Sequence, residues 1–120
     1  MKSQHFPNPL RGEFLKNGEE FILLDEFIYE NGDTRIEVPK HFVSDFNSVP
    51  RGLWNIFPPW QYPEAGVVHD FLYRTHPEGF TRKQADQIHQ DILKILGCPW
   101  IKRKASYRML RWFGGGAWKD

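Results

Sequence analysis

The sequence predicts a single α+β domain, with an N-terminal antiparallel β-meander over residues 12–39, a connector over residues 40–62 and three helices over residues 63–113. The first part has apolar runs of strand length between turn residues, the second concentrates prolines, and the third repeats apolar residues at helical spacing. A chain of 120 residues, 40% of them apolar, is about the size of one domain and can bury one core.

Short strands separated by turns are expected over residues 12–39. Turn-forming residues at 16–18 separate the first two apolar runs, and the Asn-Gly-Asp triplet at 31–33 separates the next two. Asn-Gly between two such runs is a strong signal for a β-hairpin. We therefore expect an antiparallel meander.

The connector over residues 40–62 is rich in proline and aromatic residues. Its prolines remove backbone hydrogen-bond donors and preclude a long regular element, while its aromatic side chains favour an ordered segment. Ser48 ahead of Pro50 is typical of a helix start, so one helical turn is expected over about residues 50–56, with Asp45 just before it.

Three helices are expected after the connector. Pro63 is typical of a first helical turn, and this helix should end at about Arg74. Thr81 is a good N-cap for the second helix, whose apolar residues recur at helical spacing until Gly97. The third helix is expected over residues 101–113, ahead of three glycines.

Composition and charge restrict the class of protein. Sixteen Lys and Arg residues nearly balance fifteen Asp and Glu residues, so the chain as a whole gives no electrostatic signal for nucleic acid. Cys98 is the only cysteine, which excludes an intrachain disulfide and favours a reducing cytoplasm. We expect neither a signal peptide nor a transmembrane segment, so any membrane contact should be peripheral.

The first expected helix carries the residues with the most recognisable chemistry. His69 lies within or beside its apolar stripe, and Tyr73, one turn later, lies on the same side. We therefore expect His69 to be largely buried, where a nearby carboxylate would fix its tautomer. Asp70 cannot readily supply that carboxylate, because adjacent helical residues diverge by about 100°.

Asp86, at the edge of the apolar face of the second helix, can supply the carboxylate. Two helices joined by a short turn normally pack antiparallel, which would bring Asp86 to His69. A histidine oriented by a buried acid is prepared to activate water. Asp70 would then point toward the connector, where it could bind a cation together with backbone carbonyl oxygens.

The run AGVVHDFLY at residues 65–73, followed by Ala85 and Asp86, resembles the active-site helices of phospholipase A2, particularly the compact form found in parvovirus capsid proteins. The resemblance covers about thirty residues and implies hydrolysis of phospholipid with calcium as the cofactor. The glycine-rich calcium loop of that family has no counterpart here. The roles implied are general base for His69, calcium ligand for Asp70, orienting acid for Asp86 and support of that acid for Tyr73.

A second resemblance spans more of the chain, about residues 36–115. Over this range the chain is similar to a family of small proteins of uncharacterised function that is widespread in tailed bacteriophages and prophages. The resemblance implies a phage protein made in the host cytoplasm, either a late-acting enzyme or a component of the virion, its tail or baseplate, or its assembly. The motifs are Val-Pro at 38–39, SDFNSVPR at 44–51, His69-Asp70 with Tyr73, Arg82, Ala85-Asp86 and the terminal aromatic-glycine segment.

The main candidates also have a structural interpretation. His69 and Asp86 could be a buried hydrogen-bonded pair that only fixes helix packing. Asp70 could be a solvated surface carboxylate, or it could pair with Arg74 or Arg51. Both interpretations stand beside the catalytic one.

The remaining polar residues are weaker candidates. Asp45 and Ser48 are more often turn and cap residues than catalytic ones, and Arg51 is a candidate stabiliser of an oxyanion, so these three are secondary site candidates. His89 and Asp91 are expected to face solvent. The spacing of His69, Asp70 and His89 does not suggest a zinc site.

The third helix is basic and aromatic. Lys104, Arg108 and Arg111 lie on one stripe, which usually means a solvated face. Because Trp100 and Trp112 lie nearby, the stripe could instead contact anionic phospholipid or another protein, such as a phage structural protein. Nucleic acid is a weaker candidate partner, because no known binding motif accompanies the charges.

Overall fold

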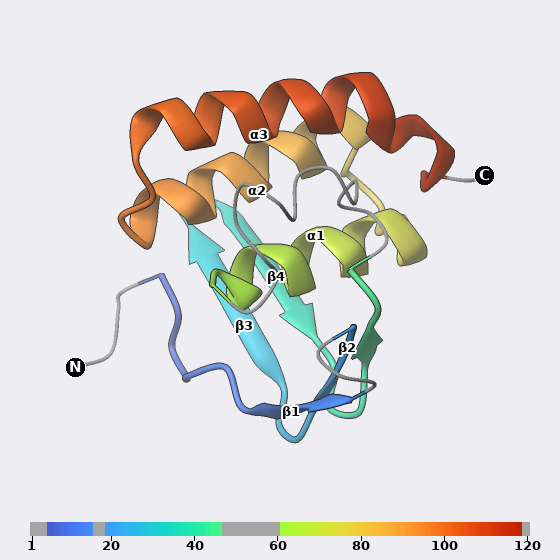
Figure 1. Cartoon of the computed structure of the whole chain (residues 1–120). Coiled ribbons are helices and arrows are strands. Elements are labelled where there is room, and N and C mark those ends of the chain that lie inside the picture. The colour runs from blue at the N-terminus through green and yellow to red at the C-terminus, as the bar shows by residue number, and fades with distance from the viewer. Residues whose placement is uncertain (1–4, 16–18, 47–60, 119–120) are drawn as a thin grey trace. The chain divides into compact units, whose positions relative to one another are not determined.

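A computed structural model describes residues 5–15, 19–46 and 61–118 of the chain. Contacts divide the chain into two compact units, Met1–Ser44 and Asp45–Asp120. The predicted α+β class is confirmed, with antiparallel strands in the N-terminal part and three helices in the C-terminal half (Figure 1). The single domain expected from the chain length stays a prediction.

The described strands form two antiparallel sheets. Asn31 pairs with Thr34 across the second hairpin, so Gly32 and Asp33 form its two-residue loop. Gly32 has a φ of 60°, which suits the glycine at the first central position of a type II′ turn. The expected strands are thus divided between two sheets, one of which gains a short strand from the start of the connector. The sheets are β1 (Gly12–Leu15), β2 (Glu20–Leu23) and β5 (Val43–Ser44), in the order β1-β2-β5, and β3 (Phe27–Asn31) paired with β4 (Thr34–Val38).

The core of the N-terminal unit includes one face of the β3-β4 hairpin. Phe27 lies opposite Val38 and Tyr29 lies opposite Ile36, and all four side chains are buried. Successive strand residues point to opposite faces, so these alternate positions share one face. Phe6 adds a stacked ring whose centroid is 5.4 Å from that of Phe27.

The helices of the C-terminal unit begin and end close to their predicted positions. The second and third helices have 14 residues each. No helix in the described part of the chain is long and apolar enough to cross a membrane. The elements are α1 (Pro63–Thr75), α2 (Arg82–Ile95), α3 (Trp100–Phe113) and the short 3-10 helix η3 (Gly114–Gly116).

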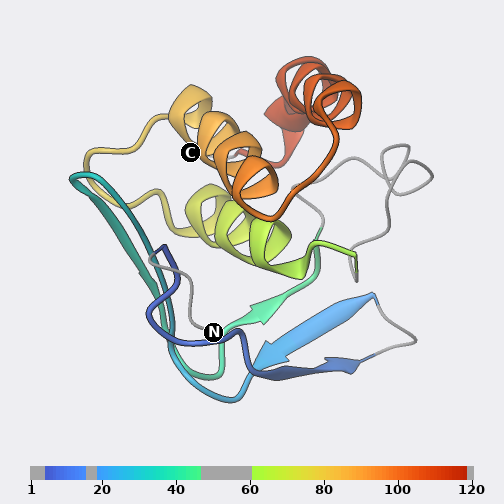
Figure 2. The ribbon, with the colours of Figure 1, turned by 90° about the vertical axis from the view of Figure 1, so that its left-hand side faces the viewer.

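α1 and α2 pack antiparallel (Figure 2). Tyr73, near the end of α1, contacts Arg82 at the start of α2. His69, one turn earlier on α1, contacts Asp86, one turn later on α2. The predicted antiparallel pair of helices is therefore present.

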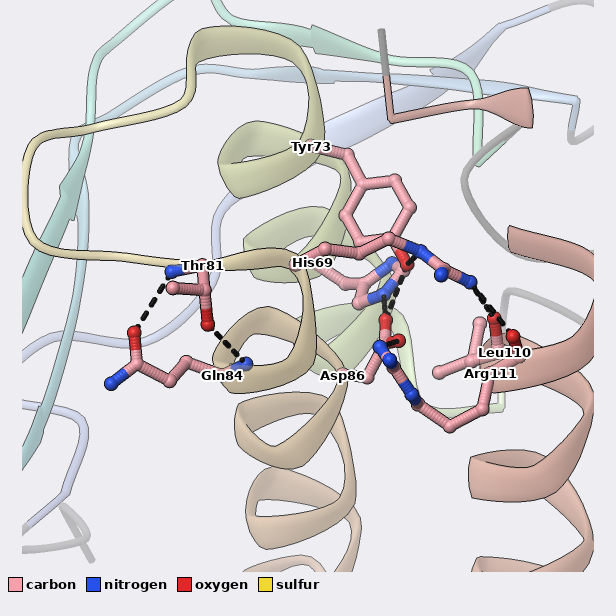
Figure 3. A network of polar contacts seen from close by, with 8 residues as sticks. His69, Tyr73, Thr81, Gln84, Asp86, Leu110 and Arg111 are labelled. Carbon is pink, nitrogen blue, oxygen red and sulfur yellow. Dashed lines mark hydrogen bonds and ion pairs between the residues drawn. The ribbon is translucent and has the colours of Figure 1, made fainter. Parts of the chain in front are cut away.

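A capping box fixes the start of α2. Thr81 is the N-cap, as predicted, and its hydroxyl accepts a hydrogen bond from the backbone N–H of Gln84. The side chain of Gln84 accepts one from the backbone N–H of Thr81 (Figure 3). Both bonds satisfy N–H groups that a helix start leaves without partners, so the first turn of α2 holds Arg82 and Asp86 in place beside α1.

Candidate functional site

Asp86 lies at the centre of a buried polar network that joins α1, α2 and α3 (Figure 3). Its Oδ1 lies 2.8 Å from Nε2 of His69 and accepts a hydrogen bond of 2.5 Å from the hydroxyl of Tyr73. Its Oδ2 accepts a bond of 2.8 Å from Nη1 of Arg111. The side chains of His69 and Asp86 are 0% exposed, so the sequence was right that His69 is buried and meets Asp86.

The three donors keep Asp86 ionised. Burial by itself raises the pKa of a carboxyl group. The hydrogen bonds from His69, Tyr73 and Arg111 outweigh that effect and hold the pKa of Asp86 below its ordinary value. Because an ionised carboxylate only accepts hydrogen bonds, Nε2 of His69 carries the proton between the two groups.

Tyr73 acts in this network as a donor. Burial first, and then the neighbouring Asp86 carboxylate, raise the pKa of Tyr73 far above its ordinary value, because both disfavour a phenolate. The Tyr73 ring also packs on the imidazole of His69, with a centroid distance of 4.1 Å. Tyr73 therefore contacts both members of the His69–Asp86 pair.

Arg82 ties the network to the end of α3. Its Nε donates to the Tyr73 hydroxyl at 3.2 Å, and its Nη2 donates to the backbone carbonyls of Leu110 at 2.7 Å and Arg111 at 3.0 Å. A cation is favoured beside the last carbonyls of a helix by the helix dipole. Arg82 therefore holds the C-terminal end of α3 beside Tyr73.

Gly114 allows η3 to approach this network closely. A Cβ atom at this position would lie 2.9 Å from the Tyr73 hydroxyl and 3.3 Å from Nη2 of Arg82. Just beyond η3, Trp118 packs edge-on against the Tyr73 ring at 5.1 Å and stacks on His76 at 3.8 Å. The aromatic-glycine segment noted in the sequence thus packs on Tyr73.

His89 is a buried neighbour of His69, and its expected exposure to solvent is wrong. The two ring centroids are 5.1 Å apart, His89 is 2% exposed, and its Nδ1 has no hydrogen-bond partner among the described residues. Burial first, and then the proximity of His69, hold the pKa of His89 well below its ordinary value, although Asp86 opposes the shift. Position 89 lies one turn after the buried Ala85, so helical spacing could have revealed its burial.

Asp70 lies outside the Asp86 network. It is 1% exposed, and its Oδ2 lies 3.5 Å from Nη1 of Arg74, one turn later on α1. Its interpretation as a solvated surface carboxylate is therefore wrong, whereas its pairing with Arg74 is confirmed.

The calcium site expected at Asp70 would also use backbone carbonyls of the connector, most of which lies outside the described residues. Calcium takes about six to eight oxygen ligands. Within residues 5–15, 19–46 and 61–118, no three His, Cys, Asp or Glu side chains are grouped so that they could hold a metal ion. The role of Asp70 as a calcium ligand stays a prediction.

The secondary candidates are only partly described. Asp45 is half-buried at the beginning of the C-terminal unit. Ser48 and Arg51, together with the helical turn expected over residues 50–56, lie outside the described residues. Their proposed roles stay predictions.

Arg111 is the network residue that the sequence reasoning missed. The expectation that it shares a solvated stripe with Lys104 and Arg108 is wrong, because its guanidinium turns toward Asp86 and its side chain is 31% exposed. One signal could have found it. A buried carboxylate needs donors for both oxygens, and His69 and Tyr73 together serve only Oδ1.

We predict that Gly114→Ala destabilises the chain by about 1–3 kcal/mol, the usual cost of overpacking. The added methyl group would meet the hydroxyl of Tyr73, which Asp86 holds in place. Gly116→Ala is the matched control, since a Cβ there has nothing within 4 Å. Urea unfolding of the two variants would measure the difference, and equal midpoints would contradict the close approach of η3.

We predict that Asp86→Asn destabilises the chain by about 3 kcal/mol or more at neutral pH. The variant removes the negative charge that pairs with Arg111 in the buried network. The native pKa of Asp86 lies below its unfolded value, so this carboxylate stabilises the fold fully above about pH 4. Its contribution is lost as the pH falls through the native pKa. The difference between wild type and variant, measured by urea unfolding from pH 7 downward, should shrink accordingly.

Asp91→Asn is the control for the same chemical change on the same helix. Asp91 accepts a hydrogen bond from Gln87 at the exposed side of α2, so its replacement should change stability by no more than about 0.5 kcal/mol. If Asp86→Asn lowered the stability of the chain as little as Asp91→Asn does, the claim that Asp86 is central to the network would be wrong.

Comparison with known proteins places most of this network inside a family. A family model described as a protein of unknown function, DUF1353, matches residues 21–110, a range that includes His69, Tyr73, Arg82 and Asp86. No curated protein and no solved structure matches the chain. The family model covers well over half of the sequence, and the chain therefore belongs to the DUF1353 family.

Proposed function

We propose that the helical unit is a phospholipase-A2-like hydrolase that cleaves an ester bond of phospholipid, with His69 as the general base. The observation that carries the proposal is that one oxygen of the buried Asp86 carboxylate meets both Nε2 of His69 and the hydroxyl of Tyr73. The phospholipase A2 resemblance implies the same division of roles, with an acid that orients the histidine and a tyrosine that supports the acid.

The contact with Asp86 gives the two nitrogens of His69 different roles. With the proton held on Nε2, Nδ1 carries the lone pair that a base needs. Nδ1 would take a proton from a water molecule as the water oxygen attacks the ester carbonyl carbon, and the Asp86 carboxylate would stabilise the imidazolium. The imidazolium would return the proton to the alcohol oxygen as the C–O bond breaks, which releases fatty acid and lysophospholipid.

Access to Nδ1 is the condition for this reaction. His69 is 0% exposed, so an ester can reach Nδ1 only in a conformation more open than the one described. None of the proton transfers above requires calcium, so the hydrolysis is best tested both with and without the ion.

The burial of His69 and Asp86 also favours a second candidate function. A fully satisfied polar network that joins three helices can serve packing alone. In that case the chain would be a non-enzymatic phage component, either of the virion tail or baseplate or of virion assembly. The phage-type motifs at residues 38–51 and 69–86 support a phage origin for both candidates.

We predict that His69→Gln lowers the rate of fatty-acid release from anionic phospholipid vesicles at least 100-fold, the usual contribution of a general base. His89→Gln is the matched control, because it changes the neighbouring buried imidazole, which makes no hydrogen bond to Asp86. This variant should retain the wild-type rate. Release would be followed with purified chain, with calcium and with a chelator.

Two results would exclude the hydrolase. One is a wild-type chain that releases no fatty acid under either condition, and the other is a His69→Gln variant that keeps the full rate. The structural candidate would then be tested by mass spectrometry of purified particles of a phage that encodes the chain, where absence of the chain would exclude a virion role.

A further inference from the structure

The outer side of α3 exposes large apolar side chains. Ile101 is 72% exposed and Trp112 70%, and Trp100 in the first turn is 59% exposed. Single exposed apolar residues are normal on a protein surface, but a contiguous patch indicates an interaction site. The side chains that α3 buries, Ser106 and Leu110 among them, lie around the opposite side of the helix.

An open groove runs along this outer side, and the described residues that line it all belong to α3. Around the helix axis, Lys104 and Arg108 fall in one sector, and Ile101, Ala105 and Trp112 fall in the adjoining sector. We call these five residues, together with Trp100, the α3 outer face. Cations thus border an apolar stripe along the length of one helix.

The charge of α3 has a single sign. The helix contains five basic residues and no acidic one. Arg111 is bound to Asp86, and Nε of Arg103 donates to the backbone carbonyl of Cys98. Of the other three, Lys102 is half-buried, whereas Lys104 and Arg108 are exposed, and neither Lys104 nor Arg108 forms an ion pair with any residue that the structure describes. The α3 outer face is therefore complementary to an anionic partner.

We propose that the α3 outer face docks on the surface of an anionic phospholipid bilayer, with the helix axis parallel to the membrane plane. Tryptophan is favoured at the boundary between headgroups and acyl chains, and lysine and arginine beside an apolar stripe can reach the anionic headgroups. Nζ of Lys104 lies 4.9 Å from the ring centroid of Trp100, so charge and aromatic surface are already combined. A protein interface core is instead depleted in lysine.

This docking is independent of the proposed hydrolysis. It uses side chains of α3, whereas the hydrolysis uses His69 and Asp86 on α1 and α2. His69→Gln should therefore bind vesicles as well as the wild-type chain does, even when it hydrolyses nothing. Failure of one proposal can thus be distinguished from failure of the other.

The test is cosedimentation of the full chain with vesicles of phosphatidylcholine alone or mixed with phosphatidylglycerol. We expect binding only to the anionic vesicles, weakened by added salt. The double variant Lys104→Glu/Arg108→Glu should bind them at least 10-fold more weakly, since it replaces two cations that attract the anionic surface by two anions that it repels. Trp100→Ala/Trp112→Ala should also bind more weakly.

Lys83→Glu/Lys94→Glu is the control, because it makes the same change of charge at two exposed lysines of α2. Near-wild-type binding by this control, with native circular dichroism for every variant, would support docking through α3. The proposal is overturned if the wild-type chain does not bind anionic vesicles or if the control loses as much binding as the α3 variant. A dimer in sedimentation equilibrium that Lys104→Glu/Arg108→Glu dissociates would also overturn it and would assign the face to a second copy of the chain.

Discussion

Burying a carboxylate away from water costs free energy that hydrogen-bond donors must offset. In the helical unit, Asp86 is such a buried carboxylate. The effective penalty for burying one ion is several kcal/mol, which is offset only when both oxygens find well-placed donors. His69 and Tyr73 come from α1 and Arg111 comes from α3, so the compensation is complete only when all three helices are packed. The capping box that fixes α2 and the close approach of Gly114 both serve this same arrangement.

The network that stabilises the fold also prepares a base. An ionised Asp86 beside Nε2 selects the tautomer of His69 in which Nδ1 can accept a proton. A purely structural role would need the same contacts, so the hydrogen bonds by themselves do not separate the two proposed functions. The two functions differ in whether Nδ1 of His69 can contact water. The α3 outer face is a separate feature, and its combination of tryptophan and cations favours an anionic membrane surface as the partner.

The helices and the His69–Asp86 contact follow from the sequence because they depend on local spacing. A short turn forces α1 and α2 to be antiparallel, and that places position 69 beside position 86. The role of Arg111 could not be predicted in the same way, because helical spacing cannot show which neighbouring helix a long side chain will reach. The polarity of His89 suggests exposure to solvent, but its helical spacing places it on the buried stripe of α2, and the spacing is the feature that holds.

The state of the His69 ring tests the central claim most directly. Long-range ¹H–¹⁵N correlation spectra of the ring nitrogens, recorded at pH 8 on the wild-type chain and on Asp86→Asn, report which nitrogen carries the proton. We expect a proton on Nε2 and none on Nδ1 in the wild-type chain, and loss of that fixed tautomer in the variant. A proton on Nδ1 of the wild-type ring, or the same ring state in both proteins, would contradict the claim that Asp86 orients His69 as a base.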